Sequence, residues 1–158
     1  MYNPKTITYT KSILNKTNNY NEPKNKSLSK DLEMVFNEET QQSFIQYLKD
    51  ANIEIPTEEI LSIEEKIKKA KSSNLKIDAI NDYVFAEGVK FGHLLKQTVG
   101  GMWAYDLKKH PYPFIKVSES FSINPISKVY KFYEYGEVES LLTMYLSMLI
   151  LMSTRNSN

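Results

Sequence analysis

Apolar residues between Ile77 and Val99 recur at steps of three and four along the chain. This spacing places them on one face of an α-helix, because the helix repeats every 3.6 residues. The pattern stops at Gly100-Gly101, and glycine supplies the left-handed backbone that ends many helices. The sequence therefore predicts one long helix and an abrupt change of structure before Trp103. The residues of the apolar face are Ile77, Ile80, Val84, Gly88, Phe91, Leu95 and Val99.

Two glycines inside this helix, Gly88 and Gly92, lie on successive turns. Each costs about 1 kcal/mol of helix stability relative to alanine. We therefore expect another element to approach them closely, and we expect the strand that carries Trp103 to turn back against both. Charged residues such as Glu87 and Lys90 surround the pair, so a membrane-helix contact is excluded. The structural residues of this junction are Gly88, Gly92, Gly100, Gly101 and Trp103.

Three short segments after the glycines have the alternation of β-strands. Met102–Asp106 alternates first, the turn 108–113 follows, and Phe114–Val117 returns as a second strand. Ser118–Ile123 can add a third strand. The pattern predicts a small antiparallel sheet of two or three strands.

Two helices are predicted after the sheet. Asn124 followed by Pro125 is typical of a helix start, and Gly136 closes that helix after Tyr135. We expect the last helix to begin at Glu137. Its inward residues would be Val138, Leu141, Leu142, Tyr145 and Leu149.

Two further helices are predicted before residue 75. The first begins at Asn37 and ends before Pro56, since the residue before proline disfavours helix. The second has two candidate caps, Thr57 and Ser62, and the segment Ser62–Glu65 fits a capping box. The predicted fold class is α+β, with helices packed on a small antiparallel sheet and a helical carboxy terminus.

The chain of 158 residues predicts a single domain over residues 31–158, long enough to bury a hydrophobic core. Residues 1–30 carry six lysines and one acidic residue, for a net charge of +5. They have few apolar groups to offset the entropy of ordering, which predicts a basic, flexible segment. Within it, Ile7–Thr10 alternates and could add an edge strand.

Residues 31–65 carry ten acidic residues and one lysine, for a net charge of −9. One interpretation is an acidic surface that binds a basic partner through Glu58, Glu59, Glu64 and Glu65. The other is a solvated helix surface with no partner. Because the charge is divided in this way, we do not expect a nucleic-acid binder with one dominant basic face.

Methionines recur every four residues near the carboxy terminus, at Met144, Met148 and Met152. They make the last helix apolar around much of its circumference. Either the helix is buried centrally, or this face binds a partner or a second copy of the chain, since methionine surfaces adapt well. A homodimer through the carboxy-terminal helix is thus one prediction.

The residues of common catalytic and metal sites are missing or badly spaced. The chain has no cysteine, so disulfides and thiolate sites are excluded. His93, Asp106 and His110 are the one candidate metal or acid–base trio, but they lack the paired spacing of a metal site. We predict no catalytic residue, no metal and no cofactor, and hence no enzyme. The alternative is a small enzyme with a cleft near Trp103.

Basic and aromatic residues interleave in the helix after Asn124, a mixture that can hold phosphates and stack bases. On a helix, however, Val129, Phe132 and Tyr133 also form an ordinary core stripe, which we favour. A nucleic-acid-binding accessory domain remains the alternative function. The interleaved residues are Lys128, Tyr130, Lys131, Phe132, Tyr133 and Tyr135.

The order of motifs over Phe85–Tyr145 resembles the DUF3806-like bacterial domains of unknown function. The matching motifs are Gly88–Gly92, the turn Gly100–Trp103 and a strand pair, followed by Ile126–Lys128 and Gly136-Glu137. The pattern departs at Val129, where a basic residue is expected. The resemblance implies a compact helix–sheet–helix domain, similar to immunity-type proteins encoded beside bacterial toxins. It implies no catalytic residues.

Together these features predict a non-catalytic bacterial or phage interaction protein, an immunity or inhibitor protein that binds and neutralises a protein target such as a toxin or a defence protein. The first residues lack a secretory signal, and Leu141–Met152 is too short an apolar stretch to span a membrane. We therefore expect a soluble, cytoplasmic protein.

Overall fold

The computed structural model describes residues 32–155 of the chain. This part divides into two compact units. The first, the sheet unit, runs from Pro56 to Met144, and the second comprises residues 32–55 and 145–155. The predicted single domain spans both units. The segment 1–30 that was predicted to be flexible, with its predicted strand Ile7–Thr10, lies outside the described residues.

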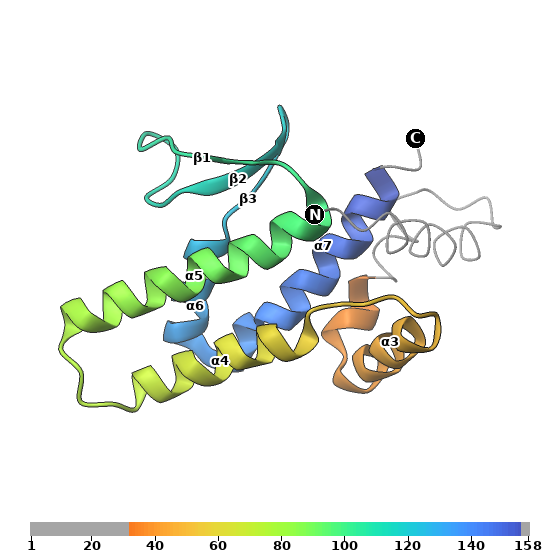
Figure 1. Ribbon diagram of the computed structural model, residues 1–158, viewed down its shortest axis with the longest axis horizontal. Helices are drawn as coiled ribbons and strands as arrows, with labels where there is room; N and C mark the ends of the chain where they lie inside the picture. Colours follow the sequence, from red (N-terminus) through yellow and green to blue (C-terminus); the bar gives the residue numbers. More distant parts are fainter. Residues whose placement is uncertain (1–31, 156–158) are drawn as a thin grey trace. The chain divides into compact units, whose positions relative to one another are not determined.

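The sheet unit is built on three α-helices. They are α4 (Thr57–Lys71), α5 (Ile77–Val99) and α6 (Pro125–Tyr135). A short 3-10 helix, η1 (Gly136–Glu139), follows α6, and α7 (Leu141–Arg155) begins in this unit and continues into the second. Figure 1 shows α4 and α5 as neighbouring helices joined by a short loop.

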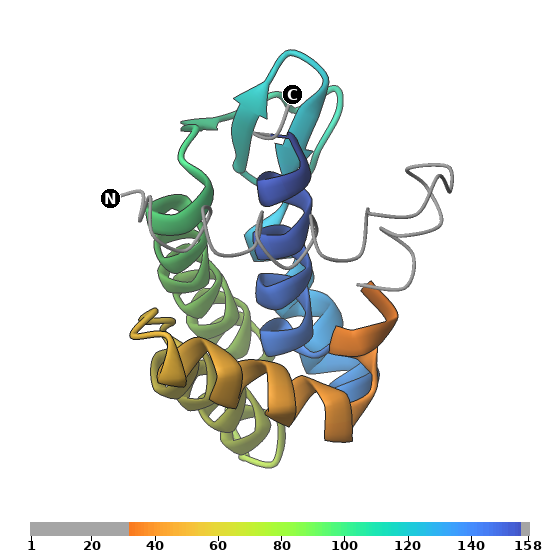
Figure 2. The same ribbon diagram turned by 90° about the vertical axis from the view of Figure 1, so that its right-hand side faces the viewer.

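Three short strands complete the sheet unit: β1 (Met102–Ala104), β2 (Phe114–Ser118) and β3 (Phe121–Ile123). They form an antiparallel sheet in the order β1-β2-β3. The sheet lies at the end of the unit where α5 ends and α6 begins (Figures 1 and 2). The predicted α+β class, with a small antiparallel sheet and a helical carboxy terminus, is confirmed.

The turn from α5 into β1 depends on its two glycines. Gly100 has a φ of +76° and Gly101 a φ of +86°, values that residues with a side chain rarely adopt. A Cβ atom on Gly101 would also lie only 2.7 Å from the carbonyl oxygen of Lys116. The predicted helix stop is confirmed, and the same turn directs the chain back along β2.

The two glycines inside α5 are close-approach positions. A Cβ atom on Gly88 would lie 2.9 Å from the Cα of Ile126, in α6. A Cβ atom on Gly92 would lie 2.3 Å from the Cη2 of Trp103, in β1. The predicted close approach is confirmed at both sites. The prediction that Trp103 turns back against both glycines is confirmed for Gly92 alone, since α6 covers Gly88.

The core of the sheet unit combines one face of each helix with the inner face of the sheet. The periodic residues of α5 are buried as predicted, except Ile77, which is exposed at the first helical turn. Val129 and Phe132 of α6 are buried too, which confirms the core stripe at these two positions, whereas Tyr133 is half-buried. Other buried side chains are Ile60, Ile63, Ile67, Phe114, Ile115, Ile123, Ile126, Leu141 and Leu142.

The predicted start of the last helix at Glu137 is wrong. Residues 136–139 form η1, and Val138, predicted to face inward, is exposed. The helix starts at Leu141 because Ser140 supplies its cap. The Ser140 hydroxyl accepts a hydrogen bond from the Thr143 amide at 3.2 Å.

The predicted capping box at Ser62–Glu65 is also wrong. α4 already begins at Thr57, directly after Pro56, so Ser62 lies inside the helix and is exposed. Proline at the helix boundary fixes the backbone there, and no side-chain cap is needed to start the helix. The other candidate, Thr57, is the first helical residue.

The second unit contains α3 (Glu38–Asp50), preceded by helical residues 32–36. The predicted helix start at Asn37 is confirmed, and Asn37 caps α3: its side-chain oxygen accepts hydrogen bonds from the amides of Glu39 (3.1 Å) and Thr40 (3.3 Å). Phe44, Ile45 and Leu48 on one side of α3 are buried, as are Tyr145, Leu146, Leu149 and Ile150 of α7.

Candidate interaction surface

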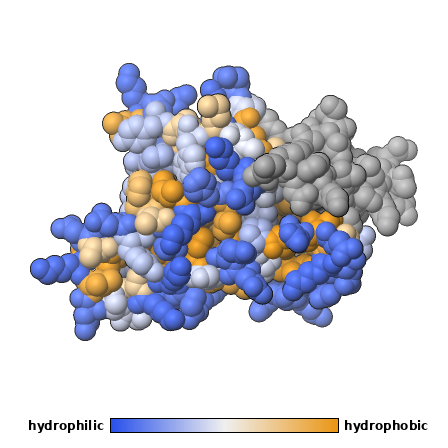
Figure 3. Space-filling model, in the orientation of Figure 1, coloured by the Kyte–Doolittle hydropathy of each residue, from blue (hydrophilic) through white to orange (hydrophobic). Residues whose placement is uncertain are grey.

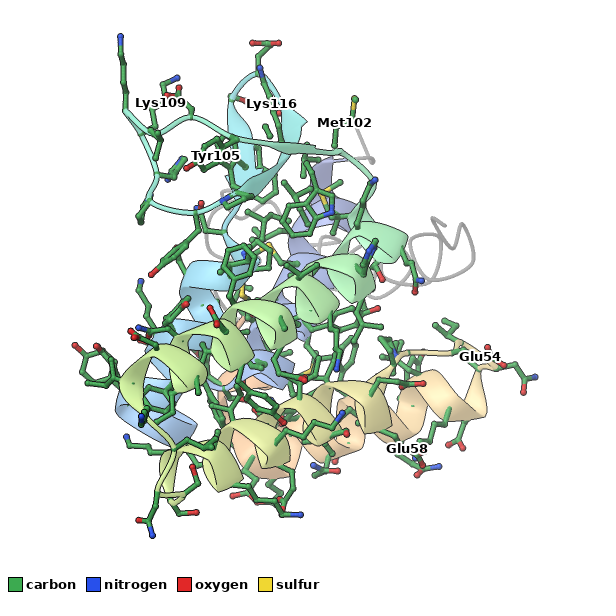
Figure 4. The ribbon with its side chains drawn as sticks, turned by 60° about the vertical axis from the view of Figure 1, so that its left-hand side comes forward. Glu54, Glu58, Met102, Tyr105, Lys109 and Lys116 are labelled. Atoms are coloured by element: carbon green, nitrogen blue, oxygen red, sulfur yellow. The ribbon has the colours of Figure 1, made fainter. Side chains whose placement is uncertain are left out.

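Three large apolar side chains are exposed at β1 and in the loop that follows it. Met102, Tyr105 and Leu107 expose 73%, 60% and 70% of their surface. Three lysines lie in the same segment: Lys108 and Lys109 in the turn after β1, and Lys116 on β2. We call these six residues the hairpin surface. In Figure 4, Met102, Lys109 and Lys116 point away from the helices.

The pairing of β1 with β2 explains why Met102 points outward. Met102 lies opposite Lys116, and Trp103 lies opposite Ile115. Side chains of directly opposed residues share one face of a sheet, and neighbours along a strand alternate between faces. Trp103 and the buried Ile115 thus face α5, where Trp103 contacts Gly92. Met102 and Lys116 consequently share the opposite, outer face, and of the residues on that face Phe114 is the one that is buried, with His110 packed against it.

Asp106 shapes the turn after β1. Its carboxylate accepts a hydrogen bond from the Lys108 amide at 3.1 Å. Its carbonyl oxygen accepts from the amides of Lys109 (3.0 Å) and His110 (2.9 Å). Aspartate commonly closes turns through such bonds to its own backbone neighbours. The turn holds both lysine side chains at the surface.

The histidines have surroundings that differ from those of metal ligands. The ring of His110 packs edge-on against Phe114, with 4.6 Å between ring centroids, and His93 is exposed on α5. Within the described part of the chain, no group of three His, Asp or Glu residues could hold a metal ion. Asp106 serves the turn.

Three aromatic rings connect the β1–β2 loop to α5 and α6. Tyr112 stacks on Tyr130 with centroids 4.7 Å apart, and Phe85 meets Tyr112 edge-on at 6.4 Å. The Tyr130 hydroxyl donates a hydrogen bond to the carbonyl oxygen of Asn81 at 3.0 Å. Burial raises the pKa of Tyr130 to about 12, and the neighbouring Tyr112 is the second contribution to this shift. These contacts fix the loop that carries Tyr105 and Leu107.

The hairpin surface is positively charged. The segment Met102–Ser118 contains three lysines and one aspartate, which gives a net charge of +2 with neutral histidine. The ammonium group of Lys116 lies 3.4 Å from the carboxylate of Glu119, but the Lys116 side chain is 47% exposed and that of Glu119 is 95% exposed. Exposed ion pairs contribute little, about 0–1 kcal/mol, so this pairing leaves Lys116 available to a partner.

The predicted acidic surface keeps three of its four residues. Glu58, Glu59 and Glu65 are exposed on α4, but Glu64 is only 5% exposed. A buried carboxylate cannot contact a partner, so the expected surface fails at Glu64. Glu58 and Glu59 also lie in the first turn of α4, and lysines fill its last turn. The helix dipole favours that arrangement by itself.

Glu64 instead joins α4 to the start of α7. Its Oε1 accepts hydrogen bonds from the Leu141 amide at 3.1 Å and from the Ser140 hydroxyl at 3.3 Å. Burial raises the pKa of Glu64, the bond from Leu141 opposes that shift, and nearby Glu137 adds to it. Glu64 thus caps a helix that is distant in sequence.

We expect Glu64→Gln to change the pH dependence of stability. Glutamine keeps the acceptor oxygen but cannot ionise. Because the folded state raises the pKa of Glu64, the stability linked to its proton is fully present below the unfolded pKa and is lost as pH rises through the folded value. Denaturant titrations from pH 4 to 8 should therefore show that, as pH falls, the free energy of unfolding of wild type rises relative to that of the variant. A pH-independent difference would contradict this, and exposed Glu65→Gln is the control.

The basic and aromatic residues of α6 are mostly engaged inside the sheet unit. Lys128 forms an ion pair with Glu139, and Phe132 is buried. Lys71, from α4, lies 5.5 Å above the ring of Tyr133. Lys131 and Tyr135 remain exposed. The nucleic-acid prediction therefore has fewer available groups than the sequence indicated.

The three methionines of α7 differ in burial. Met144 and Met148 are half-buried, whereas Met152 is only 6% exposed. The expectation of an exposed methionine face therefore fails at Met152, which cannot contact a partner from this position. Within residues 32–155, no helix is both long enough and apolar enough to cross a membrane.

The sequence signalled the hairpin surface only in part. Alternation identified the strand with Met102 and Tyr105, and the lysine–proline run identified the turn, but neither pattern states which side chains stay exposed. No protein-family model, curated protein or solved structure matches the chain. The resemblance to DUF3806-like domains stays a prediction from the motifs.

Proposed function

We propose that this chain is a non-catalytic binding protein that neutralises a protein target, in the manner of an immunity or inhibitor protein. The observation that supports the proposal best is the exposure of Met102 on β1 and of Tyr105 and Leu107 on the loop after it, whose other end is held by the stacked rings of Tyr112 and Tyr130. Neighbouring exposed apolar side chains often mark sites of protein contact. The motif resemblance to DUF3806-like, immunity-type domains is in accord with it.

The energetics suit a protein partner. Fully burying a Met, Leu or aromatic side chain contributes roughly 1.5–3 kcal/mol. A stable interface buries about 800 Å² on each partner, with a few aromatic or apolar side chains at its centre. Tyr105 and Leu107 can serve as that centre because their loop is already ordered, so little entropy is lost on binding. Figure 3 shows hydrophobic residues scattered among hydrophilic ones over the sheet unit.

The test compares two triple variants of the full chain as capture reagents in lysate of the natural host. One places aspartate at Met102, Tyr105 and Leu107. The matched control places aspartate at three exposed apolar positions on other elements, Leu61, Leu75 and Val138. We expect the hairpin variant to lose its captured protein by roughly a hundredfold and the control to retain it. Equal retention by both variants would contradict the proposal.

The acidic surface of α4 is the alternative contact surface for the same proposed function. If Glu58, Glu59 and Glu65 attract a basic target, reversing these charges should slow association. If the hairpin surface is the contact, the on-rate should stay unchanged. Surface plasmon resonance with the captured target separates the two.

A further inference from the structure

We infer that β1 accepts an extended, acidic segment of the target protein as a fourth strand of the sheet. The inference rests on the proposed function and specifies how the target would be held. The observations behind it are an edge of β1 that no strand within residues 32–155 covers, the apolar side chains beside that edge, and the positive charge of the adjoining turn.

The edge of β1 is available for pairing. The strand order places β1 at one side of the sheet, where β2 is its neighbour. Within residues 32–155, β2 is the only strand to which Met102–Ala104 pair, so the opposite edge of β1 has no partner strand there. Proteins often protect such edges with a proline or a bulge. β1 contains no proline, and the irregularity of this sheet lies between β2 and β3.

The other edge of the sheet, β3, is less suited to an acidic strand. Glu119 precedes it, Ser122 is its exposed residue, and Asn124 follows it. An acidic segment at that edge would meet a like charge and no large exposed apolar side chain. At β1, Met102 is exposed within the strand and Tyr105 is exposed directly after it.

The charge around β1 determines the chemistry of the added strand. Lys108 and Lys109 follow the Ala104 end of β1, and Lys116 shares the outer face with Met102. Carboxylates on the added strand would meet these ammonium groups, whereas lysines would be repelled. Main-chain hydrogen bonds would provide affinity, and alternate side chains would provide specificity, as is usual when a strand is added to a sheet edge.

The experiment uses the full, isotope-labelled chain and three ten-residue peptides, observed by NMR and amide hydrogen exchange. The first alternates glutamate with valine or threonine, the second replaces glutamate by lysine, and the third keeps the glutamates but has two central prolines. We expect only the first to slow exchange of β1 amides, by roughly tenfold or more, because only it can supply ordered strand hydrogen bonds. We expect Lys108→Glu/Lys109→Glu to weaken its binding by roughly tenfold.

Several outcomes would overturn the inference. Equal binding of the proline-containing peptide or of a DNA oligonucleotide would show a general site for polyanions. Failure of the glutamate peptide to protect β1, or dimerisation of the chain through this edge, would also exclude it. Suppose that one of these outcomes is found and the variant with aspartate at Met102, Tyr105 and Leu107 still loses its captured protein. The proposed function then stands without strand addition. If that variant keeps its captured protein, both proposals fail.

Discussion

Replacing Gly88 by alanine should lower the free energy of unfolding by about 1–3 kcal/mol, the usual cost of overpacking a core. Helix propensity alone predicts the opposite, a gain of about 1 kcal/mol. Packing should prevail because the new Cβ would lie 2.9 Å from the Cα of Ile126. A backbone atom cannot turn away as a side chain can, so α6 would have to move away from α5. Equilibrium denaturation in urea measures the change.

The matched control is Ala86→Gly, two residues earlier on the exposed side of α5. This variant should lose about 1 kcal/mol of the free energy of unfolding, through the lower helix propensity of glycine alone. If Gly88→Ala stabilised the protein by that amount, the close contact between α5 and α6 would be absent. Adding Ile126→Ala to the Gly88→Ala variant leaves the Cα of residue 126 in place. The second substitution should therefore not restore the free energy of unfolding.

The second large effect is expected where Gly92 meets Trp103. Gly92→Ala would bring a Cβ to 2.3 Å from the Cη2 and 2.4 Å from the Cζ2 of the indole, so the ring must be displaced from α5. We expect a loss of about 1–3 kcal/mol in the free energy of unfolding. Trp103→Ala alone should also destabilise the protein, since it removes the ring that covers this part of the helix.

A double-mutant cycle separates the contact from the two single losses. With Trp103→Ala in place, Gly92→Ala no longer displaces a ring, so its loss should largely disappear. The propensity gain of about 1 kcal/mol is opposed there by the Cγ of Pro125, which lies 3.0 Å from the new Cβ. The coupling free energy between the two sites should therefore be about 1–3 kcal/mol, within the range for residues in contact. Additive effects would show that the strand with Trp103 does not rest on Gly92. The intrinsic fluorescence of Trp103, the one tryptophan of the chain, reports ring displacement directly.

Both results bear on the proposed function, because the same junction positions the hairpin surface. Trp103 faces α5, so its neighbour Met102 faces outward. A displaced indole would change how β1 lies at the edge of the sheet. Gly92→Ala should therefore lower both target binding and stability. Gly88→Ala should lower stability alone, because it displaces α6 and not β1.

Local chemistry determined much of this fold from the sequence alone. The periodic face of α5, its stop at Gly100-Gly101 and the Asn124-Pro125 start of α6 each depend on residues that are neighbours in the chain. Such signals can be read without knowing what else packs nearby. The close approach at Gly92 was predictable for a related reason: a glycine that weakens a helix needs a compensating contact.

Burial was decided by the tertiary structure. Glu87 has the sequence context of a solvated charge, yet it is only 2% exposed, and its carboxylate pairs with the Lys90 ammonium at 2.8 Å. Glu64 is buried because residues 140 and 141, distant in sequence, donate hydrogen bonds to it. Val138 is exposed because η1 replaces the first turn of the predicted helix.

The candidate site depends on tertiary structure for the same reason. The sequence by itself determined that Met102 and Tyr105 lie near a strand and that Lys108 and Lys109 follow in a turn. Which side chains stay exposed was determined by the elements that cover each face. α5 covers the face of β1 that carries Trp103, and no described strand covers the outer edge of β1. Exposure results from contacts between residues far apart in the chain, so local patterns cannot specify it.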